Sequence, residues 1–206
     1  MDTDQDDKAM GANTLAYAGA EPGTVAQLSD PEAAVHQALA RQDYRSATGW
    51  CAHAYGGALG RLCMVMVGSQ AEAQELAQET LVIAHDAFRT YRAEGSVRAF
   101  LFGIARRVCS RHVENRGRRD AKLRLVQDGE TGGMDAAEAI ALRERAMRAR
   151  AALDQLRPTE RDAVVLRFHG ELSFRQVAEA CGVDEPTARK RVSRALARLR
   201  ASIEDS

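Results

Sequence analysis

Between residues 158 and 200, apolar positions recur with the period of an α-helix in three consecutive segments. The last of these carries apolar residues at i, i+4, i+7, i+8 and i+11, a spacing that places them all on one side. This stripe consists of Ala188, Val192, Ala195, Leu196 and Leu199. Thr187, Lys190, Arg191, Arg194 and Arg198 project away from the stripe, and Arg189 and Arg200 flank it. The pattern predicts a helix that buries one side and presents a basic side outward.

Cap and turn residues separate this basic helix from a shorter one before it. Ser173 and Gln176 form a capping-box pattern at the start of the shorter helix, and Gly182 suits a sharp turn after it. Asp184 and Pro186 supply a cap and a preset φ for the basic helix. The arrangement is that of a helix-turn-helix, whose second helix lies in the DNA major groove.

A helical hairpin with a purely structural role is the alternative interpretation of this segment. However, no acidic residue occurs from Pro186 to Arg200, whereas a helix that is merely solvated usually mixes its signs. The composition of the basic helix therefore favours DNA binding.

Helical periodicity also runs through most of the chain before this segment. The patterns predict helices at 31–41, 44–67, 71–88, 97–115, 136–156 and 159–168. Periodicity is lost between residues 118 and 135, where Gly129, Gly132 and Gly133 lie among mixed charges, as is typical of a flexible linker. We therefore predict an all-α fold with two small helical domains. The predicted parts are a disordered acidic tail (1–29), a first helical domain (30–117), the linker (118–135) and a helix-turn-helix domain (136–206).

Three glycines lie inside the predicted helix at 44–67. Gly56, Gly57 and Gly60 each weaken such a helix by roughly 1 kcal/mol relative to Ala. We expect another helix or a partner to approach closely there.

The charge distribution supports contact with a polyanion. The formal net charge of the 206 residues is zero, but seven acids and one lysine occupy residues 1–40. Six arginines and one glutamate lie between Gly103 and Arg119, and the C-terminal basic helix is a second positive block. Two separate basic blocks suggest two contacts with one nucleic acid.

Several functional classes are disfavoured. No stretch approaches the ~20 apolar residues of a membrane span, and the acidic N-terminus lacks the order of a signal peptide, so we expect a cytoplasmic protein without membrane insertion. Cys51, Cys63, Cys109 and Cys181 are scattered, and Cys51, His53 and Cys63 match no usual zinc spacing, so we expect reduced thiols and no metal. We find no catalytic constellation and no phosphate-binding glycine loop, and we predict neither an enzyme nor a cofactor.

Three stretches in order resemble bacterial sigma factors of the extracytoplasmic-function type, which retain only the second and fourth regions of the sigma family. Residues 68–80 (GSQAEAQELAQET) are similar to D-x-x-D-A-E-D-L-V-Q-E. Residues 88–107 are similar to F-R-G-x-S-x-F-R-x-W-L-Y-x-I-A-R, and 156–200 to the helix-turn-helix region. The sequence departs from the family pattern at Gln74, His85, Phe100 and Pro186. The likeness covers roughly residues 40–117 and 136–203.

The resemblance implies roles for individual residues. It assigns core RNA polymerase binding to Glu72, Glu75, Gln78 and Glu79. It assigns capture of the promoter element that melts to Tyr91, Arg92, Glu94, Ser96, Arg106, Arg107 and Arg111. It assigns reading of the upstream element to Thr187, Arg189, Lys190, Ser193 and Arg194. From the usual burial of such residue types we expect Phe100, Phe102 and Ile104 to be core residues rather than stacking platforms. An anti-sigma factor, which commonly holds family members, is a further candidate partner.

The sequence thus predicts a sigma factor that binds core polymerase, directs it to promoters and helps melt the DNA. The alternative is a stand-alone helix-turn-helix regulator whose N-terminal domain senses a signal or dimerises. The residues 68–107 discriminate between them, because a regulator has no need of that block. A third class, a metal or thiol redox sensor using the cysteines, also remains open.

Overall fold

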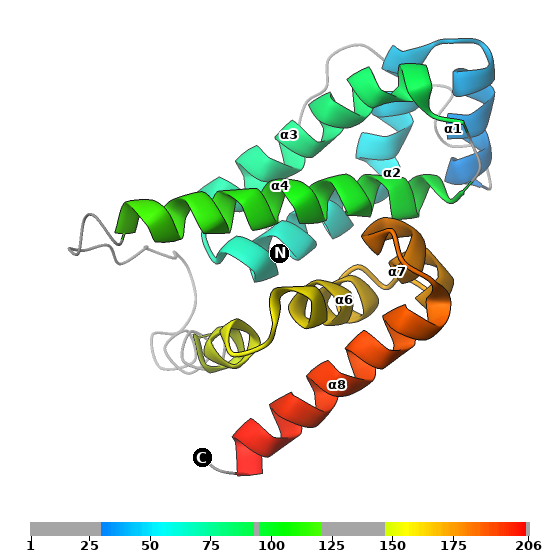
Figure 1. Cartoon of the computed structure of the whole chain (residues 1–206). Helices are drawn as coiled ribbons and strands as arrows, with labels where there is room; N and C mark the ends of the chain where they lie inside the picture. The colour runs from blue at the N-terminus through cyan, green and yellow to red at the C-terminus, as the bar shows by residue number, and fades with distance from the viewer. Residues whose placement is uncertain (1–29, 93–94, 121–146, 205–206) are drawn as a thin grey trace, which may run out of the picture.

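The computed structural model describes residues 30–92, 95–120 and 147–204, and helices are the regular elements of these residues (Figure 1). The helices are α1 (Pro31–Ala40), α2 (Tyr44–Val67), α3 (Gln70–Ala87), α4 (Val97–Asp120), α6 (Pro158–Phe168), α7 (Phe174–Cys181) and α8 (Glu185–Glu204), with a 3₁₀ turn η2 at Phe88–Thr90. Residues 147–154 are also helical. The prediction of an all-α fold is confirmed.

Local signals determine where α2 ends and α3 begins. Gly68 follows α2 with φ of +79°, and its N–H donates to the carbonyl of Met64. Ser69 then caps α3 by accepting a hydrogen bond from the N–H of Glu72. A left-handed residue closes one helix and an N-cap opens the next, so the chain reverses within two residues. The result is an α2–α3 hairpin.

The helix α4 lies between this hairpin and the C-terminal helices (Figure 1). Its first half is apolar and is buried on several sides, through Leu101, Phe102, Ile104 and Ala105. The predicted helix ended near Asn115, but α4 continues to Asp120 and so takes in the first residues of the predicted linker.

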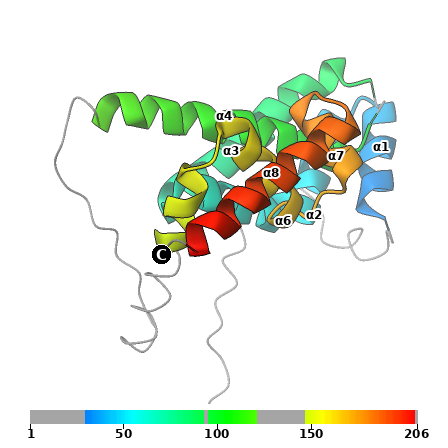
Figure 2. The same cartoon turned by 60° about the horizontal axis from the view of Figure 1, so that its bottom comes forward.

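The C-terminal helices α6, α7 and α8 form the helix-turn-helix (Figure 2). The capping box at Ser173 is present, with Ser173 accepting from the N–H of Gln176 and the Gln176 side chain accepting from the N–H of Ser173. Gly182 adopts φ of +66° in the turn. Ala188, Val192 and Ala195 are buried, as the apolar stripe predicts.

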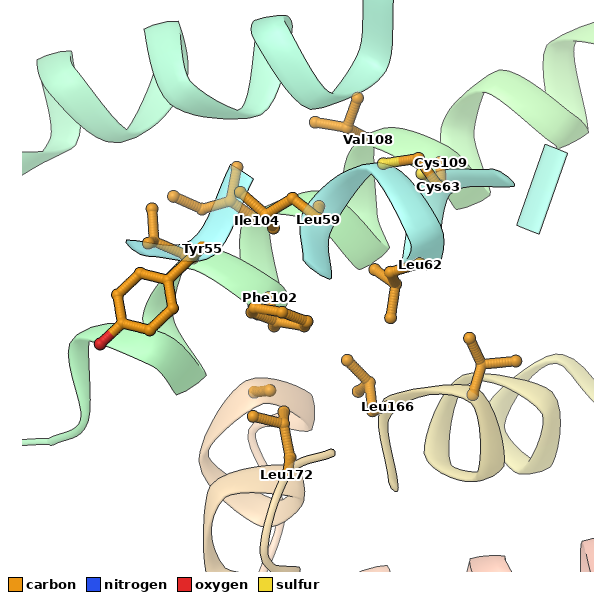
Figure 3. Packing of buried hydrophobic residues seen from close by; sticks show 14 of the residues in the cluster. Tyr55, Leu59, Leu62, Cys63, Phe102, Ile104, Val108, Cys109, Leu166 and Leu172 are labelled. Carbon is orange, nitrogen blue, oxygen red and sulfur yellow. The ribbon is translucent and has the colours of Figure 1, made fainter. Parts of the chain in front are cut away.

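The buried residues of both halves of the chain form one hydrophobic cluster. Phe102 of α4 is fully buried, with Leu59 and Ile104 on one side and Leu166 and Leu172 on the other (Figure 3). Ile104 is also buried, which supports its interpretation as a core residue. The N-terminal module (α1–α4) and the C-terminal module (residues 147–204) are therefore packed against each other.

Some predictions fall outside the described residues. These are the tail at 1–29, the linker from residue 121 to 135, and the first part of the helix at 136–156. Among the helices that are described, none combines the length and the apolar character needed to cross a membrane.

Candidate polymerase and nucleic-acid interface

The helix α3 presents a polar row at its surface. Glu75, Gln78 and Glu79 are exposed, while Leu76, Ala77 and Thr80 face the core. Positions three and four apart share one face of a helix, so the exposed members form a continuous row. This row gives the predicted polymerase-binding residues an accessible acidic surface.

Glu72, the fourth member of the predicted set, is engaged within the chain. Its carboxylate lies 3.1 Å from the Arg116 guanidinium and 3.3 Å from Nε2 of His112, both on α4. Arg116 also donates to the carbonyl of Val67 at the end of α2. Glu72 thus ties α3 to α4, whereas the other members of the row are exposed.

Three aromatic rings support the loop before α4. The Tyr91 ring centroid lies 4.7 Å from that of Phe100 and 6.1 Å from that of Phe88. The Tyr91 hydroxyl donates to the carbonyl of Gly95 at 2.8 Å. Burial and the nearby carboxylates of Glu32 and Glu179 raise the pKa of Tyr91 to about 12, so it stays protonated as a donor. Phe100 is half-buried and packs with these two rings against the hydrophobic core.

The other predicted members of the melting loop have different environments. Arg92 is exposed, and Glu94 lies outside the described residues. Ser96 receives a hydrogen bond on its hydroxyl from Gln176 at 3.1 Å, and its N–H donates to Glu179 at 3.3 Å. Both partners belong to α7, so the C-terminal module covers the start of α4.

The three arginines of α4 that were predicted to contact the melting element divide into one engaged and two exposed side chains. Arg106 forms a salt bridge with Asp162 of α6 at 2.8 Å, and Asp162 is almost completely buried. Arg107 and Arg111 are exposed.

The basic helix α8 begins at a well-formed cap. Asp184 accepts a hydrogen bond from the N–H of Thr187 at 2.8 Å, and this bond lowers the pKa of Asp184. Thr187 is half-buried at the cap, while Lys190 is exposed one turn later and Ser193 and Arg194 are exposed two turns later. The first three turns of α8 thus present polar and basic side chains to solvent.

Arg189 and Arg191 of α8 contact other side chains of the helix-turn-helix. The Arg189 guanidinium lies 4.4 Å from the Phe174 ring centroid and pairs with Glu185. Such stacking and pairing fix the side chain at the base of the helix-turn-helix. Arg191 was expected to project outward, but it is half-buried and hydrogen-bonds Cys181. The turn of the motif brings Cys181 next to it.

Sequence reasoning missed the acidic partners of α4. Asp162 and Glu179 were given no role, although they contact Arg106 and Ser96. One signal was available, because Asp162 precedes the apolar run Ala163–Leu166 on a helix whose apolar face is buried. A carboxylate in such a position needs a cationic partner.

The cysteines are free thiols, and three of them are buried. Cys63 and Cys109, far apart in sequence, lie side by side and share a hydrogen bond (Figure 3). This bond and burial raise the pKa of Cys109, and burial raises that of Cys51 to about 12. Across residues 30–92, 95–120 and 147–204, no three His, Cys, Asp or Glu side chains gather as metal ligands do.

Comparison with known families gives the class of protein. Residues 51–119 match the family Sigma-70 region 2, and residues 146–199 match the family Sigma-70, region 4. The matched stretches include α3, α4 and the helix-turn-helix described above. They are the two parts of a sigma factor that the sequence resemblance indicated.

A curated relative refines the assignment. Over 141 residues the chain is 30% identical to the ECF RNA polymerase sigma factor EcfG of Rhodopseudomonas palustris (strain TIE-1), covering 65% of this chain and 72% of that protein. The chain belongs to the extracytoplasmic-function sigma factors. Proteins of this family are not enzymes, and they act with core RNA polymerase and promoter DNA.

Two solved structures share the fold. CnrH, in complex with the cytosolic domain of CnrY, superposes with a TM-score of 0.63 at 21% identity, covering 86% of this chain and 99% of that chain. The sigma factor RpoE of Bartonella quintana, in complex with the anti-sigma factor NepR, gives a TM-score of 0.51 at 23% identity, covering 72% and 91%. At these identities the likeness concerns the fold.

Proposed function

We propose that this protein binds core RNA polymerase through α3, directs it to a two-part promoter and helps to open the DNA, acting in the cytoplasm. The observation that carries the proposal is the presence of two exposed, oppositely charged helix faces. One is the acidic row of α3, and the other is the basic start of α8.

The α8 face fits the upstream promoter element. Lys190, Ser193 and Arg194 are exposed near the start of a helix whose opposite side is buried. Arg pairs bidentately with guanine, and Lys and Ser anchor phosphates or bases. The capped N-terminus of α8 adds a positive dipole end near the DNA.

The α3 face fits a basic partner helix. Gln78 and Glu79 lie three and four positions after Glu75, so the three residues share one face of α3. Opposite charges across an interface steer association and fix register. Glu72 lies at the end of this row, where its pairs with His112 and Arg116 hold α3 against α4.

The loop before α4 fits the element that melts. Tyr91 and the exposed Arg92 stand beside an aromatic cluster at the entrance to α4, and Arg107 and Arg111 follow on the helix. A base taken out of the stack is read by hydrogen bonds and stacking, and the arginines would hold phosphates.

Run-off transcription tests the whole proposal. We expect purified core polymerase plus this protein to produce specific transcripts from a randomised promoter library. A stand-alone regulator would instead bind DNA without polymerase and yield no transcript, and that result would refute the proposal.

Two matched pairs of substitutions test the faces separately. Glu79→Lys should weaken core binding about 10-fold, since a like charge then faces a basic partner. Asp154→Lys reverses an exposed acid that lies outside α3 and pairs with Arg161, and it should leave core binding unchanged. Arg194→Ala should cost ~1–3 kcal/mol of promoter binding and relax one base preference. Arg200→Ala removes the same charge near the far end of α8 and should lose much less, equally on all sequences.

A further inference from the structure

Three carboxylates of the C-terminal module lie against arginines and a backbone N–H group at α4. Asp162 of α6 pairs with Arg106 at 2.8 Å, and Glu171 pairs with Arg98 at 3.5 Å. Glu179 of α7 accepts from the N–H of Ser96 at the start of α4. We call these three acids, Asp162, Glu171 and Glu179, the acidic clamp.

The clamp occupies groups that a nucleic acid would use. Arginine guanidiniums and backbone N–H groups at a helix N-terminus are the usual donors to phosphate oxygens. Here carboxylate oxygens accept from the same kinds of donor. Arg106 and Ser96 are among the residues that the proposed function assigns to the melting element, so this inference rests on that function.

Close packing holds the clamp in place. A Cβ added at Gly103 of α4 would lie 3.1 Å from the backbone carbonyl oxygen of Ala180 on α7, so the two backbones nearly touch. Arg98 also donates to the carbonyl of Gly170 at 2.8 Å, and Phe102 fills the space between the modules (Figure 3). The acids therefore face α4 in a fixed register.

By contrast, the polymerase-facing and upstream-reading surfaces lie outside the clamp. Glu75 and Glu79 on α3 are exposed, as are Lys190 and Arg194 on α8. The closed arrangement thus occupies part of one of the three proposed contacts, at Arg106 and Ser96, and leaves the other two accessible.

We propose that the acidic clamp is an autoinhibitory contact in which region 4 carboxylates stand in for DNA phosphates on α4. In the closed chain two groups of the melting element, Arg106 and Ser96, are occupied, and they become available only when the two modules separate. Binding to DNA then occurs from the open fraction, so the apparent dissociation constant equals the intrinsic one divided by that fraction.

A pair of matched variants tests the clamp. Asp162→Asn removes the carboxylate that pairs with Arg106, and Asp154→Asn removes one that pairs with Arg161, both at 2.8 Å in the same module. We expect Asp162→Asn to increase the radius of gyration in small-angle X-ray scattering, with Asp154→Asn matching the wild type. Glu179→Gln, at an exposed position that does not endanger folding, should act in the same direction.

Binding of a labelled, mixed-sequence single-stranded 20-mer to the full chain gives the second readout. Asp162→Asn should bind about 10-fold tighter than Asp154→Asn, as expected when a state populated near one tenth becomes dominant. In an Arg106→Ala background the gain from Asp162→Asn should disappear.

Equal affinity and equal radius of gyration for Asp162→Asn, Glu179→Gln and Asp154→Asn would contradict the proposal of an autoinhibitory clamp.

Core polymerase pull-down and run-off transcription on the same preparations distinguish failure of the clamp from failure of the proposed sigma role. If the variants contradict the clamp but the protein still directs transcription, the proposed function is retained. Tighter DNA binding by Asp162→Asn without any transcript would support the clamp and contradict the sigma role.

Discussion

Gly68 closes α2 in a conformation that other residues rarely adopt. Its φ is +79°, and an added Cβ would overlap the Arg150 guanidinium, which donates to the carbonyl of Met66 at 3.0 Å. We predict that Gly68→Ala lowers the free energy of unfolding by ~1–2 kcal/mol, mainly through the left-handed backbone. The flexible Arg150 side chain can move away, although its hydrogen bond would be lost. Urea denaturation followed by circular dichroism measures the change.

Gly56 provides the control, because it is a helical glycine in open surroundings. Among the described residues nothing lies within 4 Å of a Cβ built there, and the same holds at Gly49 and Gly60. The expected close approach of another helix is therefore absent from the described part of the chain. Gly56→Ala should raise stability by ~0.5–1 kcal/mol. A loss at Gly56 equal to that at Gly68 would show that backbone conformation does not decide the outcome.

At the scale of helices, two caps of different chemistry begin the helices of the DNA-binding motif. Ser173 caps α7 through a complete capping box, and Asp184 caps α8 through the N–H of Thr187. Ser173→Ala should cost ~1 kcal/mol. The Asp184→Ala loss should depend on pH, because hydrogen bonds lower the folded-state pKa of this carboxyl.

The sign of that pH dependence follows from linkage. A lowered folded-state pKa contributes stability above the unfolded value of 3.8, and this contribution is lost as the pH falls through the folded pKa. The stability difference between wild type and Asp184→Ala should therefore be full at pH 7 and shrink below about pH 4. The Ser173→Ala difference should stay constant over the same range. Thermal unfolding of the three proteins between pH 3 and 7 distinguishes these outcomes.

Helix positions were predictable because their signals are local. The predicted helix at 44–67 coincides with α2, and the cap at Ser173 and the turn at Gly182 are present as expected. The partners of α4 were not predictable, since Arg106 meets Asp162 from 56 positions away. Likewise the half-buried position of Arg191 depends on the turn that brings Cys181 beside it. Candidate site residues were identified by family resemblance, and their roles remain predictions.

For the whole molecule, the contact between modules is the feature that couples its parts. One hydrophobic cluster runs through both modules, with Phe102 at its centre (Figure 3). A sigma factor that reads two separated promoter elements needs its modules to reach both at once. We therefore expect the stability of the contact between α4 and α7 to affect DNA binding, because this contact occupies Ser96 of the melting element while the exposed face of α8 lies outside it.

Gly103 allows that contact to be changed by a single methyl group. A Cβ at this position would lie 3.1 Å from the carbonyl oxygen and 3.3 Å from Cα of Ala180, and both belong to the backbone of α7, which cannot rotate away as a side chain can. We predict that Gly103→Ala separates the modules, because overpacking costs ~1–3 kcal/mol. The same change gains ~0.5–1 kcal/mol of helix stability within α4. Hydrogen exchange should therefore become faster in α7 while the amides of α4 stay protected. Unchanged exchange in α7, with Gly56→Ala as the reference, would mean that the two helices can adjust without separating.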